Sequence, residues 1–153
     1  TQLPQEDIQL QALWDILREN ACFESGWPAS RLPCLLPADS WVRGNLNALA
    51  QALENILRNA IRHSPHGGCV QLDGCREGDY WHIWLQDQGP GIAEGDLERI
   101  FAPFTRLDGS RPGDGGFGLG LSIARNAVQR QGGRLWAENT GRGLRVHLRL
   151  LAR

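Results

Sequence analysis

Asn55, Asn59 and Arg62 form the first group of residues in this sequence that could do chemistry. Their spacing of i, i+4 and i+7 places them in one row of a helix, beside a stripe of apolar positions. Two amide oxygens one turn apart can complete the oxygen shell of a hydrated Mg²⁺ that is held mainly by phosphates. A solvated helix face explains the same row, and for the row taken alone it is the better explanation.

The segment from Asp87 to Gly91, with the sequence DQGPG, forms the second group. It follows an alternating strand pattern that turns Asp87 toward the core, where a carboxylate needs a hydrogen-bond partner. An exocyclic amine such as N6 of adenine is a suitable donor, and the glycines let the backbone approach a flat ring closely. A turn in which the aspartate bonds its own backbone is the alternative explanation.

A glycine-rich run over residues 113–121, GDGGFGLGL, leads into a predicted helix. Free backbone N–H groups and the positive end of the helix dipole converge there, which is typical of an anion site. A loop precedes this run instead of a strand, so the pattern disfavours a dinucleotide-binding fold. A flexible linker is the plainer interpretation of the glycines alone.

Two phenylalanines and two arginines lie between these groups. Phe101 and Phe104 end a short predicted helix, and core anchoring is the expected role of both. Arg106 and Arg111 follow in the loop. They could clamp a triphosphate through charge-assisted hydrogen bonds, although loop arginines are more often simply solvated.

The elements that must position these residues alternate along the chain. The periodicity predicts helices over 6–22, 46–63, 94–100 and 119–131, and strands over 31–36, 69–75, 80–87, 134–139 and 144–151. Asn45 is expected to cap the second helix. This order favours a single domain over 1–153 of the α+β class, a two-layer α/β sandwich in which a mixed β-sheet is packed on helices.

Composition excludes several classes of function. The formal net charge is -1, so no basic field would attract nucleic acid or anionic lipid. Lysine is absent, which excludes a P-loop nucleotide site. The four cysteines form no C-x-x-C pair, which disfavours a zinc site or a disulfide framework. No apolar run approaches the ~20 residues of a membrane span, so we expect a piece that is not membrane-inserted. Methionine is also absent, from which we expect a fragment of a longer protein.

In order and spacing, the motifs together resemble the GHKL (Bergerat-type) ATPase superfamily, and within it the sensor histidine kinases. Residues 55–65, NILRNAIRHSP, are similar to the N box, and residues 87–91 to the first glycine box. Residues 101–104, FAPF, resemble the F box, and residues 116–121, GFGLGL, the second glycine box. The resemblance covers nearly the whole chain and implies the Bergerat-type ATP-binding fold.

This resemblance implies that ATP and Mg²⁺ bind between the N-box helix and a lid over residues 102–117, and that the γ-phosphate passes to a histidine. Asn55 and Asn59 would be the catalytic residues on the magnesium side. Arg62 would contact phosphate, His63 the adenine or ribose, and Asp87 the adenine. The remaining implied ATP contacts are Gly89, Gly91, Ile92, Phe104, Arg106, Arg111, Gly116, Phe117, Gly118, Leu119, Gly120 and Leu121.

Three departures from the family pattern shape the expectation. His63 stands where Tyr or Phe is usual, and Leu144 stands where Thr or Ser often follows the last glycine pair. None of the four histidines lies in a helix of the phosphoacceptor type. We therefore expect the acceptor on a separate dimerisation and phosphohistidine domain, a response regulator receiver domain as the indirect partner, and a cytoplasmic location within an inner-membrane bacterial sensor.

Two alternative functions remain at this point. GHKL ATP hydrolases place a general-base Glu at the first N-box position, which is Asn55 here. Glu54 is adjacent but rotated by about 100° around the helix, and an i, i+4 surface pair with Arg58 is its expected role. A degenerate nucleotide-sensing module that transfers no phosphate is the second alternative.

Overall fold

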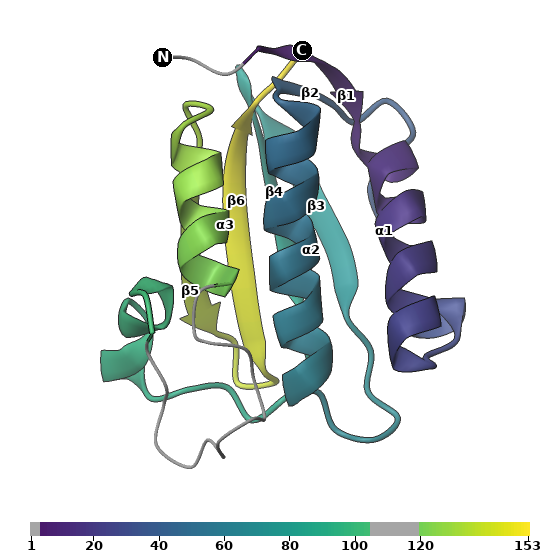
Figure 1. Ribbon diagram of the computed structural model, residues 1–153, viewed down its shortest axis with the longest axis vertical. Coiled ribbons are helices and arrows are strands. Elements are labelled where there is room, and N and C mark those ends of the chain that lie inside the picture. Colours follow the sequence, from purple (N-terminus) through teal and green to yellow (C-terminus); the bar gives the residue numbers. More distant parts are fainter. Residues whose placement is uncertain (1–3, 105–119) are drawn as a thin grey trace.

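The computed structural model describes residues 4–104 and 120–153, and Figure 1 shows them as two layers. Three helices lie side by side across one face of a four-stranded sheet, with α2 between the other two. The helices are α1 (Leu10–Ser25), α2 (Leu46–His63) and α3 (Gly120–Gln129). The sheet has the order β3 (Gln71–Glu77), β4 (Tyr80–Gln86), β6 (Leu144–Leu151) and β5 (Arg134–Asn139). The predicted two-layer sandwich is confirmed.

All three strand pairs of this sheet are antiparallel, and one parallel bridge at its β3 edge makes it mixed, as predicted. There Cys34 lies opposite Leu72, whose N–H donates to the carbonyl of Pro33 at 3.0 Å. The strand predicted over 31–36 is reduced to this bridge. Residues Ala29–Arg31 form the 3-10 turn η1 instead, and Pro33 has no N–H to extend a ladder.

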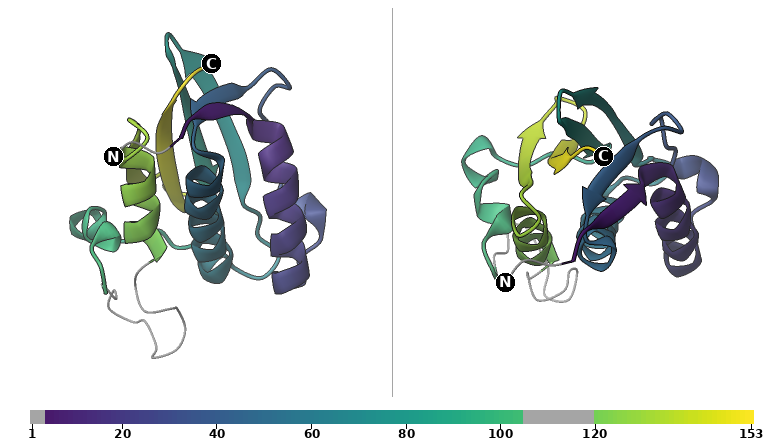
Figure 2. Two further views of the ribbon diagram at one scale, coloured as in Figure 1. Left: turned by 45° about the horizontal axis from the view of Figure 1, so that its top comes forward. Right: turned by 90° about the horizontal axis from the view of Figure 1, so that it is seen from above.

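The first predicted helix is wrong at its start, because Glu6–Gln9 is the strand β1. It pairs antiparallel with β2 (Trp41–Gly44), which the sequence did not predict, and together they form a small second sheet (Figure 2). Glu6 lies opposite Gly44, far away in the chain. Helical periodicity cannot reveal such a partner, and four residues are too few to specify a helix against it.

Helix α2 has the predicted bounds and the predicted cap, since the Asn45 side chain accepts from the N–H of Ala48 at 2.9 Å. Glu54 and Arg58 form the predicted i, i+4 ion pair at 2.8 Å. At its N-cap, α2 is also tied to the segment just after α3, because the buried Gln131 accepts from the N–H of Asn45 at 2.8 Å. The buried stripe comprises Leu49, Ala52, Leu53, Ile56, Leu57 and Ala60.

The core fills the space between the helices and the sheet. Trp81, Ile83 and Leu85 of β4 are buried on the helix side, as the alternation predicts. Trp14 of α1 is fully buried, and its indole N–H donates to the carbonyl of Leu32 at 3.0 Å. A buried indole with its donor satisfied contributes large apolar area without an unpaired polar group.

The helix predicted over 94–100 is two separate 3-10 turns, η2 (Glu94–Asp96) and η3 (Arg99–Phe101). Gly95 lies inside the first turn, and glycine disfavours a continuous α-helix over so short a segment. The predicted helix over 119–131 is α3, which ends at Gln129, and its predicted first residue lies outside the described part of the chain. The predicted hairpin strands over 134–139 and 144–151 are confirmed as β5 and β6.

The face of the sheet opposite the helices carries stacked rings, several of them covered by arginine. The Trp136 and His147 rings stack with centroids 4.9 Å apart and planes 6° apart. Guanidinium groups lie over the rings in six pairs across the described chain: Arg31–Trp27, Arg125–Phe101, Arg134–Trp136, Arg145–Trp84, Arg149–Tyr80 and Arg153–Trp41. Such pairs combine cation–π attraction with coverage of apolar surface.

His147 and His82 share a hydrogen bond on this face, with 2.8 Å between Nδ1 of His147 and Nε2 of His82. The other nitrogen of His147 lies 2.7 Å from Oε1 of Glu138. Burial lowers the pKa of His147, and the charges of His82 and Arg145 act in the same direction, whereas Glu138 opposes them. The folded state therefore favours the neutral His147 imidazole.

We expect acid to destabilise the fold partly through His147. A histidine in the unfolded chain titrates at about pH 6.5, and the pKa of His147 in the folded protein lies below that value. The contribution of the neutral His147 to the free energy of unfolding is therefore fully present above about pH 6.5, and it is lost as the pH falls toward the folded pKa. Urea unfolding at several pH values should show a smaller loss of unfolding free energy in His147→Gln than in the wild type.

The exposed His66 supplies the matched control, and His66→Gln should leave the dependence on pH unchanged. The pKa of His63 is lowered too, chiefly by desolvation, so His147→Gln should reduce the slope without removing it. Identical slopes for the wild type and His147→Gln would contradict the assignment.

Candidate functional site

Asp87 lies at the end of β4 and is 4% exposed, so its predicted inward orientation is confirmed. Its Oδ1 atom accepts from the N–H of Gly89 at 3.0 Å and from that of Leu144 at 2.9 Å. The first bond is the self-bonded turn considered as the alternative. Both hydrogen bonds that the described residues donate to this carboxylate end on Oδ1, and none of them ends on Oδ2.

Two glycines allow three segments to meet around this carboxylate. A Cβ atom on Gly89 would lie 2.6 Å from the carbonyl oxygen of His63, at the end of α2. A Cβ atom on Gly143, whose φ is 136°, would overlap the carbonyl oxygen of Asp87. Glycine is required at both positions, so the end of α2, the loop after β4 and the β5–β6 turn are held in contact.

Leu144 replaces the hydroxyl residue that the family pattern often has, yet it bonds to Asp87 through its main-chain N–H. Its side chain is buried at 7% exposed and packs in the core. Any residue other than proline can make this main-chain contact. The departure at Leu144 therefore leaves the support of Asp87 intact.

The N terminus of α3 lies against α2 at the first asparagine of the predicted row. A Cβ atom on Gly120 would lie 3.8 Å from the Cβ of Asn55, so the described end of the second glycine box is a neighbour of the N box. Asn55 and Asn59 are both half-buried on α2. Neutral amide oxygens fit a hydrated Mg²⁺ whose other ligands come from phosphate and water.

Arg62 and His63 are exposed at the end of α2. Desolvation is the largest cause that lowers the pKa of His63; the charge of Arg62 adds to it, and the charge of Asp87 opposes it. The imidazole is therefore neutral at neutral pH. An uncharged ring near Asp87 suits a neighbour of an adenine or a ribose better than a contact to phosphate.

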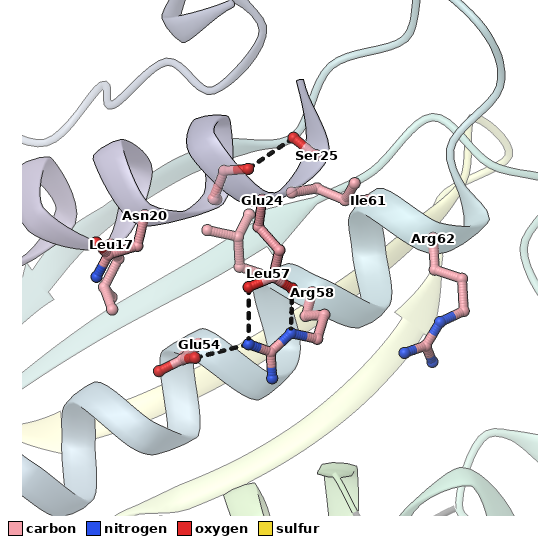
Figure 3. Close-up of a pocket in the computed structure, with 10 residues that line it drawn as sticks. Leu17, Asn20, Glu24, Ser25, Glu54, Leu57, Arg58, Ile61 and Arg62 are labelled. Carbon is pink, nitrogen blue, oxygen red and sulfur yellow. Dashed lines mark hydrogen bonds and ion pairs between the residues drawn. The ribbon is translucent and has the colours of Figure 1, made fainter. Parts of the chain in front are cut away.

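A groove of about 260 Å³ lies between α1 and α2, and Figure 3 shows its lining. Arg58 lies there between Glu24 and Glu54, with hydrogen bonds of 2.8 Å to each carboxylate. Arg62 is at one end of the groove and extends away from this cluster (Figure 3). Asn55, Asn59 and Asp87 do not line it, so among the described residues Arg62 is the one predicted nucleotide contact that borders this groove.

The two phenylalanines of the predicted F box differ in their surroundings. Phe101 is buried at 4% exposed, beneath the guanidinium of Arg125, and anchors the core as predicted. Phe104 is 71% exposed, with a positive φ of 62°, so core anchoring is wrong for this residue. Ala102 and Pro103 are exposed as well, so the chain has already left the core surface by residue 104.

Part of the predicted site cannot be placed. The predicted ATP contacts that lie outside the described residues are Arg106, Arg111, Gly116, Phe117, Gly118 and Leu119. Gly120 and Leu121 are the first residues of α3, and Leu121 packs against the core. The described end of the second glycine box thus supplies a helix N terminus beside Asn55, as the anion-site prediction requires.

Sequence reasoning missed Asn139 and Gln86, which support the loop after β4. Asn139 bonds to both main-chain groups of Ile92, and Gln86 donates to the carbonyl of Asp87 at 2.8 Å. No feature of the sequence marks either residue, because an asparagine at the end of a strand is typical of any turn, and a glutamine within a strand is typical of any solvated face.

Two further observations concern the described residues alone. Residues 4–104 and 120–153 contain no group of three or more His, Cys, Asp or Glu side chains that could hold a metal ion. In the same ranges no helix has the length and apolar character to cross a membrane.

The chain is similar in sequence to sensor kinases. The chain is 61% identical over 151 residues to sensor protein PfeS of Pseudomonas aeruginosa, covering 99% of the chain and 33% of that protein. It is 40% identical over 147 residues to sensor histidine kinase CpxA of Escherichia coli, covering 92% of the chain and 31% of CpxA. The chain thus spans about a third of the length of these curated relatives.

Solved structures show the same fold. A mycobacterial sensor histidine kinase, MprB, superposes with a TM-score of 0.80 at 27% identity, over 98% of this chain and 99% of that one. A nucleotide-free catalytic domain of histidine kinase ThkA gives a TM-score of 0.80 at 21% identity and supports the fold alone. The sequence pattern of the family of histidine kinase-, DNA gyrase B- and HSP90-like ATPases matches residues 44–153, and the chain belongs to this family.

Proposed function

We propose that this chain binds ATP with Mg²⁺ and donates the γ-phosphate to a histidine on a separate dimerisation and phosphoacceptor domain. The observation that carries the proposal is the buried Asp87 carboxylate. Its Oδ1 is held by two backbone N–H groups at the place where α2, the loop after β4 and the β5–β6 turn meet, and we assign Oδ2 to accept from the ligand. A rigid acceptor of this kind selects a ligand that presents a donor, as N6 of adenine does.

The proposed roles follow from position along α2. Asp87 reads the base, and the neutral His63 lies beside the base or the ribose. Farther along the helix, Asn59 and Asn55 orient the phosphate end through the metal, and Arg62 contacts phosphate. Mg²⁺, when bound, neutralises charge on the phosphate oxygens. The N terminus of α3 and the loop arginines Arg106 and Arg111 complete the proposed phosphate contacts.

Hydrolysis of ATP by water is the weaker alternative. It needs a general base at the position of Asn55, and an amide cannot accept the proton. The adjacent Glu54 is bound to Arg58 on the side of α2 that faces α1. A module that senses nucleotide without transfer is a further alternative, and the test below distinguishes it from the kinase.

The proposed partners follow from the same assignment. The dimerisation and phosphohistidine domain of the same protein is the direct partner, and the receiver domain of a response regulator is the indirect one. We further propose that the domain works in the cytoplasm as part of a membrane-anchored sensor; the names of its relatives support the sensor role. The formal net charge of -1 favours no nucleic acid partner.

We expect the isolated chain not to label itself when incubated with ATP carrying a radioactive γ-phosphate. None of its four histidines lies in a helix of the phosphoacceptor type, so the nucleophile must come from outside. Addition of the protein's own dimerisation domain should restore acid-labile labelling on that domain. Electrophoresis with autoradiography measures both results.

An acceptor domain with its histidine changed to alanine is the control, and it should remain unlabelled. Stoichiometric phosphohistidine on the isolated chain would contradict the proposal. ATP binding without transfer to the intact acceptor domain would favour the sensing module, and phosphate release without transfer would favour the hydrolase.

A further inference from the structure

Asn139, the last residue of β5, reaches across to the loop that follows Asp87. Its Oδ1 accepts from the N–H of Ile92 at 3.0 Å, and its Nδ2 donates to the carbonyl of the same residue at 2.5 Å. Nδ2 also lies 3.0 Å from Oε1 of Glu94. One side chain thus satisfies both main-chain groups of Ile92, as a neighbouring strand would do.

The loop is shaped to admit this side chain. Gly91 has a φ of 73°, and a Cβ atom there would lie 2.7 Å from Oδ1 of Asn139. The asparagine therefore occupies the space that any other residue at position 91 would fill. This observation gives the second glycine of the DQGPG segment a structural reason that is separate from contact with a base.

The hydrogen bonds of Asn139 hold the end of the segment that Asp87 does not hold. The carboxylate holds the start of the segment through Gly89, and the asparagine holds its end through Ile92. Between these two anchors lie Pro90 and Gly91, in the segment that is proposed to lie against a flat ring. Loops are mobile where their main-chain groups lack such partners, so the two anchors together fix the surface presented to the base.

We infer that Asn139 is a positioning residue for base recognition, acting through residues 89–92. The inference rests on the proposed ATP binding and adds a determinant of specificity to it. The phosphate end of the proposed site is held by α2 and α3 and has no described contact with Asn139. Loss of Asn139 should therefore weaken recognition of the base much more than recognition of the phosphates.

Asn139→Ala removes the bonds to Ile92 and should weaken ATP binding by about 10-fold, with a smaller effect on GTP. The ratio of the two dissociation constants should therefore fall. Competition of each nucleotide against a fluorescent ATP analogue measures this ratio. When the chain is joined to its acceptor domain, KM for ATP should rise while kcat stays within about 2-fold, because the phosphate end is unchanged.

Asn139→Asp and Glu94→Gln provide a rescue. The aspartate keeps an acceptor for the N–H of Ile92 but places charge against the carbonyl of Ile92 and the carboxylate of Glu94, so it should be worse than alanine. Adding Glu94→Gln replaces that carboxylate with an amide that can donate, and should recover part of the ATP affinity. Glu94→Gln alone should change it little, because Oε1 remains an acceptor.

The exposed Asn20 of α1 gives the matched control, and Asn20→Ala should bind both nucleotides like the wild type. If Asn139→Ala does not fold, the comparison of Asn139→Asp with and without Glu94→Gln decides the question. Failure of the wild type to bind ATP would overturn the proposed function itself. Wild-type binding with an unchanged ATP-to-GTP ratio in the Asn139 variants, or with no rescue, would overturn only the role of Asn139.

Discussion

Asp87→Asn is expected to weaken ATP binding by at least ~10-fold and to remove the preference of the wild type for ATP over GTP. In the proposed site Oδ2 of the wild type would accept from the adenine amine, whereas guanine would present a carbonyl oxygen at that edge and leave two acceptors facing each other. The asparagine can keep Oδ1 on its two backbone donors, while its amide NH2 group, which can only donate, takes the place of Oδ2. Calorimetric titration of both proteins with both nucleotides measures the result.

The structure separates the two roles of this carboxylate. Circular dichroism and melting of Asp87→Asn should stay near wild type, because Oδ1 can still accept from Gly89 and Leu144. Asp87→Ala should lower the free energy of unfolding by about 1–3 kcal/mol, because it leaves two donors near the core without a partner. Equal wild-type affinities for ATP and GTP would remove Asp87 from the base site.

Asn59→Ala is expected to lower phosphate transfer to the acceptor domain by about 100-fold, the size of effect seen when one group that stabilises transferring charge is lost. The proposed amide ligand on the magnesium side disappears, while Asp87 and the loop after β4 are untouched. Initial rates of transfer, measured over a range of Mg²⁺ concentrations, should show both a lower maximum and a higher requirement for the metal.

The fold should tolerate this change, because Asn59 is half-buried and alanine is the better helix former. ATP binding measured in the presence of a metal chelator should therefore match the wild type. Asn20→Ala, at an exposed position of α1, serves again as the control. A wild-type rate and an unchanged Mg²⁺ requirement in Asn59→Ala would remove this residue from the catalytic group.

Much of the fold follows from local patterns. Helix α2, its Asn45 cap and the strands β5 and β6 were predicted at their observed bounds, because an amphipathic stripe or a strict alternation is visible within the element. Strands β1 and β2 were missed since each is four residues long and is specified by the other. The helix predicted over 94–100 became two 3-10 turns, which a short apolar pattern cannot distinguish from an α-helix.

The site divides in the same way. The alternation along β4 was sufficient to predict that Asp87 points inward. The resemblance of the motifs to the family pattern assigned Asn55 and Gly120 to one site, and the two residues are neighbours in the structure. Exposure of Phe104 could not be predicted, because its pattern is that of a core residue and only the course of the backbone decides its burial. Asn139 was equally hidden, since its role depends on a loop that lies 47 residues away in the sequence.

The arginines that cover aromatic rings have a consequence for colloidal behaviour. The sheet face away from the helices carries two tryptophans and a tyrosine, Trp84, Trp136 and Tyr80, each under a guanidinium plane. A planar cation can lie flat on a ring and still bind water at its edge, which a lysine ammonium cannot do. The rings are thereby withdrawn from contact with other molecules while the surface stays hydrated. In a chain whose sixteen basic residues are all arginine, the same side chains thus shield this face against self-association.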